Sequence, residues 1–209
     1  MVPVTPQRQP VVGPPAFENL RVSPLCNTLL LGYLAQRGIP ADIAARECVE
    51  VHYNIHGKRN FSIGFRSRSG GLELRNPYFK GSVSPKDITC IERNTENSAN
   101  TKVLVFEGFI DYLSYLTLKR GHPVPDCVVL NSASNLPRAM DILKRYSHVC
   151  CFLDNDRTGR DATQEIRRQC EKVSDMAVHY MPHKDLNEFL ISRLGITATW
   201  QKKKEQKKG

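Results

Sequence analysis

Two short acidic clusters, each directly behind an apolar run, constrain this chain more than any other feature. Glu107 follows the run 103–106 (VLVF), and Asp154 and Asp156 follow the run 149–153 (VCCFL). Short runs of β-branched and aromatic residues that stop at glycine-containing turns are typical of buried parallel strands. Open α/β sheets bind ligands at the carboxyl ends of such strands, so we expect these carboxylates to gather at one sheet edge.

The second half of the chain alternates short apolar runs with helix-forming segments. The expected strands are 103–106, 127–131, 149–153 and 176–181, and the expected helices are 109–120, 136–146, 158–172 and 185–194. This alternation predicts an α/β domain, with a parallel sheet covered by helices on both faces and right-handed crossovers.

The first half of the chain shows a different pattern of residues. Helical periodicity at 28–37 and a proline at the start of 41–46 predict a short helical hairpin. Alternating segments from 49 to 75, with a Gly70-Gly71 turn, then predict a small antiparallel sheet.

These patterns divide the chain into four parts. The polar segment 94–100 is the expected domain boundary, and the first 25 residues hold six of the 13 prolines. The expected parts are a Pro-rich arm or linker at 1–25, a small basic mixed α/β subdomain at 26–93, an α/β domain at 101–195 and a Lys-rich tail at 196–209.

Cysteine usage and hydropathy limit the class of protein. Seven cysteines with no C-x-x-C spacing argue against a disulfide framework and against a zinc ribbon. No apolar stretch approaches the length of a membrane span, and no signal-peptide pattern opens the chain. We therefore expect a reduced cytoplasmic protein that has no zinc site in this chain and no membrane partner.

The net charge of +9 is shared between the tail and the body. Residues 201–209 contribute +4, so the rest of the chain carries +5. An excess of positive charge that persists without the tail points to polyanionic partners.

The three carboxylates at strand ends predict a divalent-cation site. Glu107, Asp154 and Asp156 offer hard oxygen ligands of the kind that suit Mg²⁺ or Mn²⁺ and, through the metal, phosphate. A calcium loop is the rival interpretation, because Asp154 to Glu165 nearly satisfies the EF-hand spacing. An EF-hand needs a helix before its loop, however, and the segment 146–153 favours a strand.

With these motifs in place, the C-terminal half resembles a Toprim domain, a module of bacterial primases, topoisomerases and some nucleases. The family signature is a Glu after the first strand and Asp-x-Asp after the third, here Glu107 and Asp154/Asp156. The segments "VFEGFIDYLSYL" and "FLDNDRTGRDA" are similar to the bacterial DNA primase forms. The upstream segments "YLAQRGIPADIAARECV" and "FSIGFRSRSGGLELRNPYFKGS" resemble the start and the basic β subdomain of the primase polymerase core. Similar sequences occur in Toprim proteins of bacterial mobile elements.

The resemblance implies roles for individual residues. Glu107 would act as general base or metal ligand, and Asp154 and Asp156 would hold the metal. Asp111, about one helical turn from Glu107, would orient the site. Asp185 is expected both as a helix N-cap, with Glu188 as its capping partner, and as a further acid of the site.

The predicted β subdomain carries a set of basic residues with two possible roles. The residues are Arg66, Arg68, Arg75 and Lys80. They fit a solvated strand face and a template groove equally well, with Phe65, Tyr78 and Phe79 as candidate stacking groups.

Two classes of function follow. The first is a primase-like, metal-dependent nucleotidyl transferase that uses nucleoside triphosphates and single-stranded DNA in replication or mobilisation of a mobile element, with a Toprim nuclease as its variant. The second is a DNA-binding accessory protein without turnover. Nothing before Asn27 has metal-ligand spacing, so a zinc-binding module would be upstream, on another chain or unused, and a helicase is a further expected partner. The three carboxylates favour an enzyme, because gathering them costs free energy unless a cation neutralises them.

Overall fold

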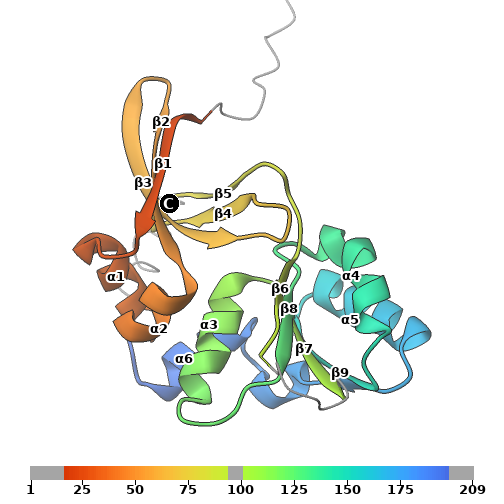
Figure 1. The fold of residues 1–209 in the computed structure, drawn as a ribbon. Coiled ribbons are helices and arrows are strands. Elements are labelled where there is room, and N and C mark those ends of the chain that lie inside the picture. Colours follow the sequence, from red (N-terminus) through yellow and green to blue (C-terminus); the bar gives the residue numbers. More distant parts are fainter. Residues whose placement is uncertain (1–16, 94–100, 198–209) are drawn as a thin grey trace, which may run out of the picture.

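The computed structural model describes residues 17–93 and 101–197, and two five-stranded sheets organise them (Figure 1). The first sheet has the order β1-β2-β3-β4-β5, with antiparallel neighbours throughout. Its strands are β1 (Glu18–Pro24), β2 (Val49–Ile55), β3 (Lys58–Arg66), β4 (Leu72–Arg75) and β5 (Lys80–Val83). Strands β2 and β3 form a hairpin that projects away from the rest of the molecule (Figure 1).

Helices α1 (Thr28–Ala35) and α2 (Ala41–Glu47) form the predicted helical hairpin between β1 and β2. The side chain of Asn27 caps α1 by accepting hydrogen bonds from the backbone N–H groups of Leu29 and Leu30. Such a cap satisfies donors that the first helical turn leaves unpaired.

The second sheet has the order β10-β9-β7-β8-β6. Its strands are β6 (Thr89–Ile91), β7 (Lys102–Phe106), β8 (Asp126–Val129), β9 (His148–Phe152) and β10 (Val173–Asp175). The predicted parallel pairing of β7 with β9 is confirmed, and β8 and β10 are parallel to them as well. Strand β6 adds one antiparallel edge next to β8.

Helices cover both faces of this second sheet (Figure 1). They are α3 (Phe109–Leu118), α4 (Leu136–Leu143), α5 (Arg157–Gln169) and α6 (Leu186–Arg193), with two short 3₁₀ helices, η1 (Ala133–Asn135) and η2 (Ala177–Tyr180). Along β7, Leu104 and Phe106 belong to one core cluster, which includes residues of α3 and α6, whereas Val103 and Val105 belong to another, which includes residues of α4 and α5. This alternation follows from the two-residue repeat of a strand, and it explains the continuous apolar run in the sequence.

Three expectations need correction. Residues 18–24 are not a linker but strand β1, which pairs with β2 because the segment 20–24 (LRVSP) can extend along an open strand edge. The expected strand at 176–181 is wrong: β10 lies earlier and η2 occupies 177–180. Strand β6 falls in the expected first subdomain yet pairs with β8, so the chain joins the second sheet before the expected boundary.

Packing between aromatic rings connects the two sheets. Phe65 at the end of β3 stacks on Phe109 at the start of α3, with ring centroids 5.2 Å apart. The expected boundary at 94–100, the first 16 residues of the arm and the tail from 198 lie outside the described residues. Within the described ranges, no helix combines the length and the apolar character that a membrane crossing requires.

Candidate active site

Glu107 and Asp154 lie side by side at the carboxyl edge of the second sheet. Glu107 follows the last residue of β7, Asp154 comes two residues after the end of β9, and these two strands are neighbours. The backbone N–H of Asp154 donates a hydrogen bond to Glu107 Oε2 at 3.4 Å. The structure therefore brings together two carboxylates that are 47 residues apart in the sequence.

Asp156 lies next to this pair, and its side chain also caps a helix. Its Oδ1 accepts a hydrogen bond of 3.0 Å from the backbone N–H of Gly159 and so caps α5. Gly159 packs so closely that a Cβ atom there would lie 2.1 Å from the carbonyl oxygen of Asp154. The Gly in this motif is required because the first turn of α5 touches the backbone that carries Asp154.

Asp111 and Asp185 approach the same edge from α3 and α6. Asp111 is buried, and its Oδ1 accepts a 3.2 Å hydrogen bond from the backbone N–H of Asn187. Asp185 caps α6 through a 2.8 Å bond from the N–H of Glu188, as the sequence predicted.

Lys184 supplies a positive charge between the aspartates. Its Nζ lies 2.8 Å from Asp154 Oδ2 and 3.8 Å from Asp156 Oδ2. The hydrogen bond to Asp154 raises the pKa of Lys184 above its ordinary value, so it carries a full charge at neutral pH. Sequence reasoning assigned it no role, although it directly precedes Asp185 in the chain.

Burial, and after it the repulsion between neighbouring carboxylates, raises the pKa values of Glu107, Asp111 and Asp154. Burial, followed by repulsion from Asp154, raises the pKa of Glu107. Burial also raises the pKa of Asp154, in spite of its ion pair with Lys184. Burial and the neighbouring Asp185 and Asp154 place the pKa of Asp111 well above its usual range. One lysine therefore does not compensate this cluster, which would be stabilised by more positive charge.

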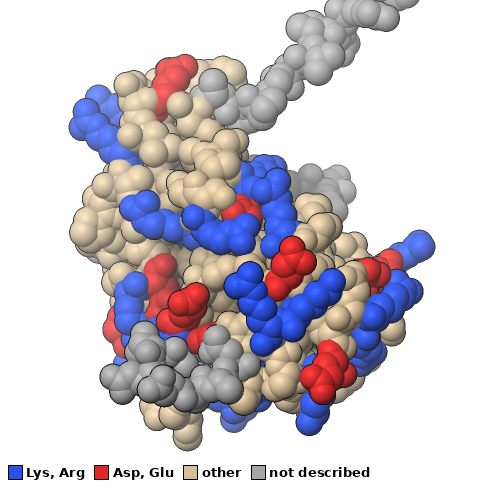
Figure 2. All heavy atoms as spheres, turned by 45° about the vertical axis from the view of Figure 1, so that its right-hand side comes forward, with Lys and Arg blue, Asp and Glu red and all other residues tan. Residues whose placement is uncertain are grey.

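A pocket of about 420 Å³ opens over these carboxylates and reaches the first sheet. The acidic residues of its lining are Glu107, Asp111, Asp154 and Asp185 at the carboxyl edge and Glu73 on β4, whereas Asp156 lies outside the lining. The basic residues of its lining are Arg37, Arg75, Lys80, Lys86 and Lys184, of which Lys184 contacts Asp154. Figure 2 shows a band of Lys and Arg side chains across the middle of one face of the molecule.

Two of the four predicted basic residues line this pocket, and two do not. Arg75 and Lys80 are paired across β4 and β5 and face the pocket. Arg68 instead forms an ion pair with the buried Asp87 at 3.2 Å, and Arg66 is exposed outside the pocket lining. Of the four predicted basic residues, Arg75 and Lys80 are therefore the two that share a pocket with the carboxylates.

The three candidate stacking residues differ in whether they are buried or exposed. Phe65 is buried against Phe109, and Phe79 packs near Phe17 and Tyr53 in the core of the first sheet. Tyr78 alone of the three is exposed, with 92% of its surface accessible. It remains the available aromatic group for stacking.

A buried hydrogen-bond network that the sequence did not reveal supports the site. Arg37 donates to Tyr33 Oη at 2.7 Å and to Asn187 Oδ1 at 2.8 Å, and Arg75 donates to the same Tyr33 oxygen at 3.1 Å. Asn187 in turn donates to Ser114 Oγ at 2.9 Å. Helix α1 is thereby fixed to α3 and α6 beside Asp111. Arg37 and Asn187 are 150 residues apart and match no motif, so no sequence signal could have paired them.

The carboxylates of the site have the chemistry of divalent-cation ligands, but they are not arranged as a complete coordination shell. Across residues 17–93 and 101–197, no three His, Cys, Asp or Glu side chains are arranged as a metal-binding group. The ammonium of Lys184 instead lies against both aspartates. Carboxylate oxygens are nevertheless the donors that Mg²⁺ and Mn²⁺ prefer, and a cation would relieve the repulsion between these groups.

Comparison with known proteins agrees with this geometry. Residues 104–190 match the family described as Toprim-like. The chain contains a Toprim-like domain. Residues 19–84, which include β1 to β5, match a family described only as a domain of unknown function. No curated protein matches the chain.

Two solved structures share the fold across both parts of the chain. The primase fragment of the bacteriophage T7 primase-helicase protein is 20% identical, with a TM-score of 0.56 over 89% of this chain and 80% of that one. A second match is one chain of a structure of the bacteriophage T7 lagging-strand DNA polymerase interacting with primase domains of two gp4 subunits bound to an RNA/DNA hybrid and dTTP. It is 17% identical, with a TM-score of 0.52 over 85% of this chain and 88% of that one. The Toprim-like domain therefore lies within a primase-like fold, and the predicted fold class is confirmed.

Proposed function

We propose that this protein is a primase-like, divalent-metal-dependent nucleotidyl transferase that acts on single-stranded DNA with nucleoside triphosphates. The observation that carries the proposal is one pocket of about 420 Å³ that is lined both by carboxylates and by Lys and Arg side chains. Phosphoryl transfer needs both kinds of group, because the protein must position phosphates and offset their charge as the reaction proceeds.

The basic residues would bind the anionic reactants. Arg75 and Lys80 extend from adjacent strands, so they suit the triphosphate or the template backbone entering from the first sheet. Arg75 is oriented by its hydrogen bond to Tyr33, which reduces the entropy lost when it binds phosphate.

The carboxylates would hold the cation and handle the proton. Asp154 and Asp156 would be its main ligands, with Glu107 beside them; the cation would supply charge neutralisation to the phosphate oxygens. Glu107 has a raised pKa because of burial and Asp154, which makes it a stronger base for the proton of an attacking hydroxyl. Asp111 and Asp185 contribute further negative charge from α3 and α6.

A cellular context completes the proposal. One neighbouring structure is a fragment of a primase-helicase protein, which supports a helicase as a partner of this chain. Replication or mobilisation of a bacterial mobile element in the cytoplasm is the setting that we propose for this activity. A separate zinc-binding module would assist template recognition if one is used.

The test is a single incubation of the protein with single-stranded DNA, labelled nucleoside triphosphates and Mg²⁺ or Mn²⁺. New short labelled products support the transferase, and shortening of the DNA identifies a nuclease instead. The variant Asp154→Asn should lose either activity. The matched control, Asp161→Asn, alters an exposed aspartate on α5 that lies outside the pocket lining and should retain full activity. Absence of both products would support the accessory role.

A further inference from the structure

A second pocket, of about 480 Å³, lies at the other end of α3 from the carboxylates. It is formed by α2, by the C-terminal end of α3 and by the loop that leads to β8. Asp111 of α3 lines the first pocket and Leu116 lines the second, and the two linings share no residue. About 7.5 Å of helix separates them, so this is a second, distinct cavity.

Positive charge dominates the rim of this second pocket. The basic residues are Arg46, Arg93, Lys119, Arg120 and His122. Asp42 forms an ion pair with Arg120 at 2.8 Å and is the acidic residue of the lining. Within residues 17–93 and 101–197, Lys119 and His122 have no ion-pair partner, so the rim keeps charge available for an anion.

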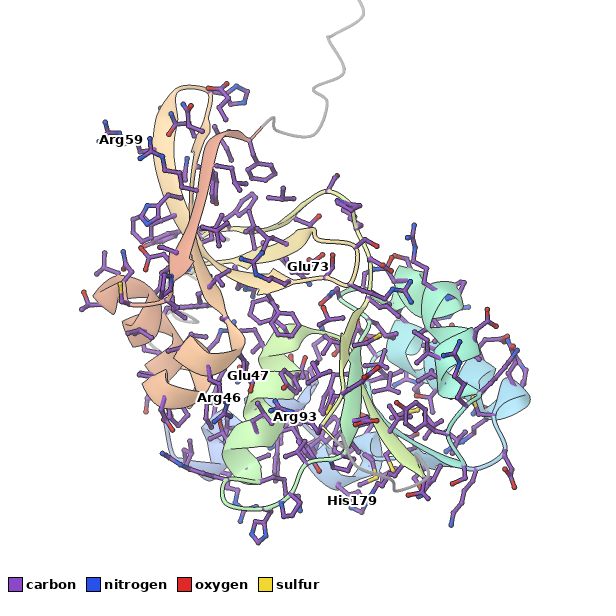
Figure 3. All side chains as sticks on the ribbon, viewed as in Figure 1. Arg46, Glu47, Arg59, Glu73, Arg93 and His179 are labelled. Atoms are coloured by element: carbon purple, nitrogen blue, oxygen red, sulfur yellow. The ribbon has the colours of Figure 1, made fainter. Side chains whose placement is uncertain are left out.

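Arg93 is held in place before any ligand arrives. Its guanidinium contacts Glu47 Oε1 at 2.8 Å and also donates to the hydroxyl of Tyr112, which itself donates to Glu47 Oε2 at 2.7 Å. Figure 3 shows Arg46, Glu47 and Arg93 gathered beside α3. A fixed guanidinium loses little conformational entropy on binding, which favours recognition of phosphate.

The remaining walls of the pocket are apolar. Ile43 and Leu116 are core residues that form its buried floor, and the accessible apolar surface comes from Pro123 and the partly buried Val124. An apolar wall with a cationic rim fits a molecule that carries a flat apolar part and a phosphate. A nucleotide has both.

We propose that this second pocket binds the phosphate of a nucleotide, whose base lies against Pro123 and Val124. The phosphate would contact Lys119 and His122 at the rim, with Arg93 behind them. The source is either a free nucleotide or the 5′-phosphorylated end of a nucleic-acid strand. This site goes beyond the proposed reaction, because it lies away from Glu107 and Asp154 and requires none of them.

The test measures binding by fluorescence anisotropy in EDTA. The probes are a fluorescent ATP analogue and a labelled DNA 10-mer with either a 5′-phosphate or a 5′-hydroxyl. All proteins carry Arg75→Ala and Lys80→Ala, so that the first pocket contributes little. Onto this background are added either Lys119→Ala with His122→Ala, or the control Lys144→Ala with Arg145→Ala on residues after α4.

We expect the Lys119/His122 pair to weaken binding by roughly tenfold, since each charge-assisted contact contributes to affinity. The control pair should leave the affinity unchanged. Loss confined to the ATP analogue identifies a free nucleotide, and loss confined to the 5′-phosphorylated DNA identifies a strand end. Equal affinities of the two pairs for every probe, or no binding by the background protein, would overturn the proposal. Because all four substituted residues are exposed, unchanged melting temperatures should confirm that each variant is folded.

Discussion

Replacing Gly159 with Ala tests whether the packing of α5 against Asp154 sets the geometry of the site. The added Cβ would lie 2.1 Å from the carbonyl oxygen of Asp154 and 2.8 Å from its nitrogen, whereas ordinary contacts begin at 3.4 Å. Both contacts are with backbone, so no side chain can rotate away. The backbone at Asp154 must therefore move by at least about 1 Å, and its carboxylate moves with it.

Two effects of different size follow from this displacement. Overpacking of a close contact costs about 1–3 kcal/mol, which lowers the melting temperature of a chain of this size by roughly 2–4 °C for each kcal/mol. A displacement of about 1 Å in a reacting group reduces the rate by about 100-fold. We expect a protein that remains folded and has lost nearly all primer synthesis.

Gly32→Ala is the matched control. Gly32 lies in α1, and beyond the backbone of that helix nothing lies within 4 Å of the position that a Cβ would take. The same added methyl group should raise stability by about 0.5–1 kcal/mol, because Ala favours a helix more than Gly does. Thermal unfolding and primer synthesis are measured on both variants. Wild-type stability and activity of Gly159→Ala would refute the argument from packing.

Three further predictions concern charge. Burial alone would raise the pKa of Asp87, but hydrogen bonds from Ser69, the backbone N–H of Ile88 and Arg68 outweigh burial and lower this pKa. The ionised form of Asp87 therefore stabilises the fold at neutral pH, and this stabilisation is lost as the pH falls below about 4. Asp87→Asn should therefore lower the melting temperature at pH 7, and the difference from wild type should shrink progressively as the pH falls through the lowered pKa of Asp87. Arg75→Glu with Lys80→Glu should nearly abolish binding of single-stranded DNA that carries no 5′-phosphate, in anisotropy titrations at two salt concentrations, whereas deletion of residues 201–209 should weaken it only modestly. Loss of all binding on that deletion would contradict the role of the basic strands. Glu73→Gln should strengthen binding of single-stranded DNA, because Glu73 (Figure 3) is an acidic residue among the basic residues of the first pocket. A fall in the affinity for DNA would show that Glu73 positions these basic residues instead.

Local patterns in the sequence were sufficient for most of the fold. The runs at 103–106 and 149–153 are apolar at every position because each strand is buried on both faces, and such runs can be recognised without a structure. The glycine in the Asp154–Gly159 motif and the capping pair Asp185 and Glu188 are likewise local signals, since the residues that interact are close in the chain. The carboxyl edge of the sheet could therefore be predicted as the place where Glu107 and Asp154 meet.

Edge strands were harder to predict. Strand β1 has an exposed face and few apolar residues, so its extended conformation depends on hydrogen bonds to β2 and not on its own pattern. Strand β6 has only three residues and is defined by its pairing with β8. Short strands of this kind exist because a neighbour offers its backbone, which no local window of sequence contains.

The sequence by itself predicted which carboxylates gather at the candidate site and which ends of which strands they follow, because these depend on residue type and short spacing. Only the tertiary structure decided which basic residues join them: Arg75 and Lys80 face the carboxylates, while Arg68 is paired with Asp87. It also decided that Lys184 lies between the aspartates. The physical reason is that charge interactions act through space over a few ångströms, and the chain brings such groups together only after both sheets and their helices have packed.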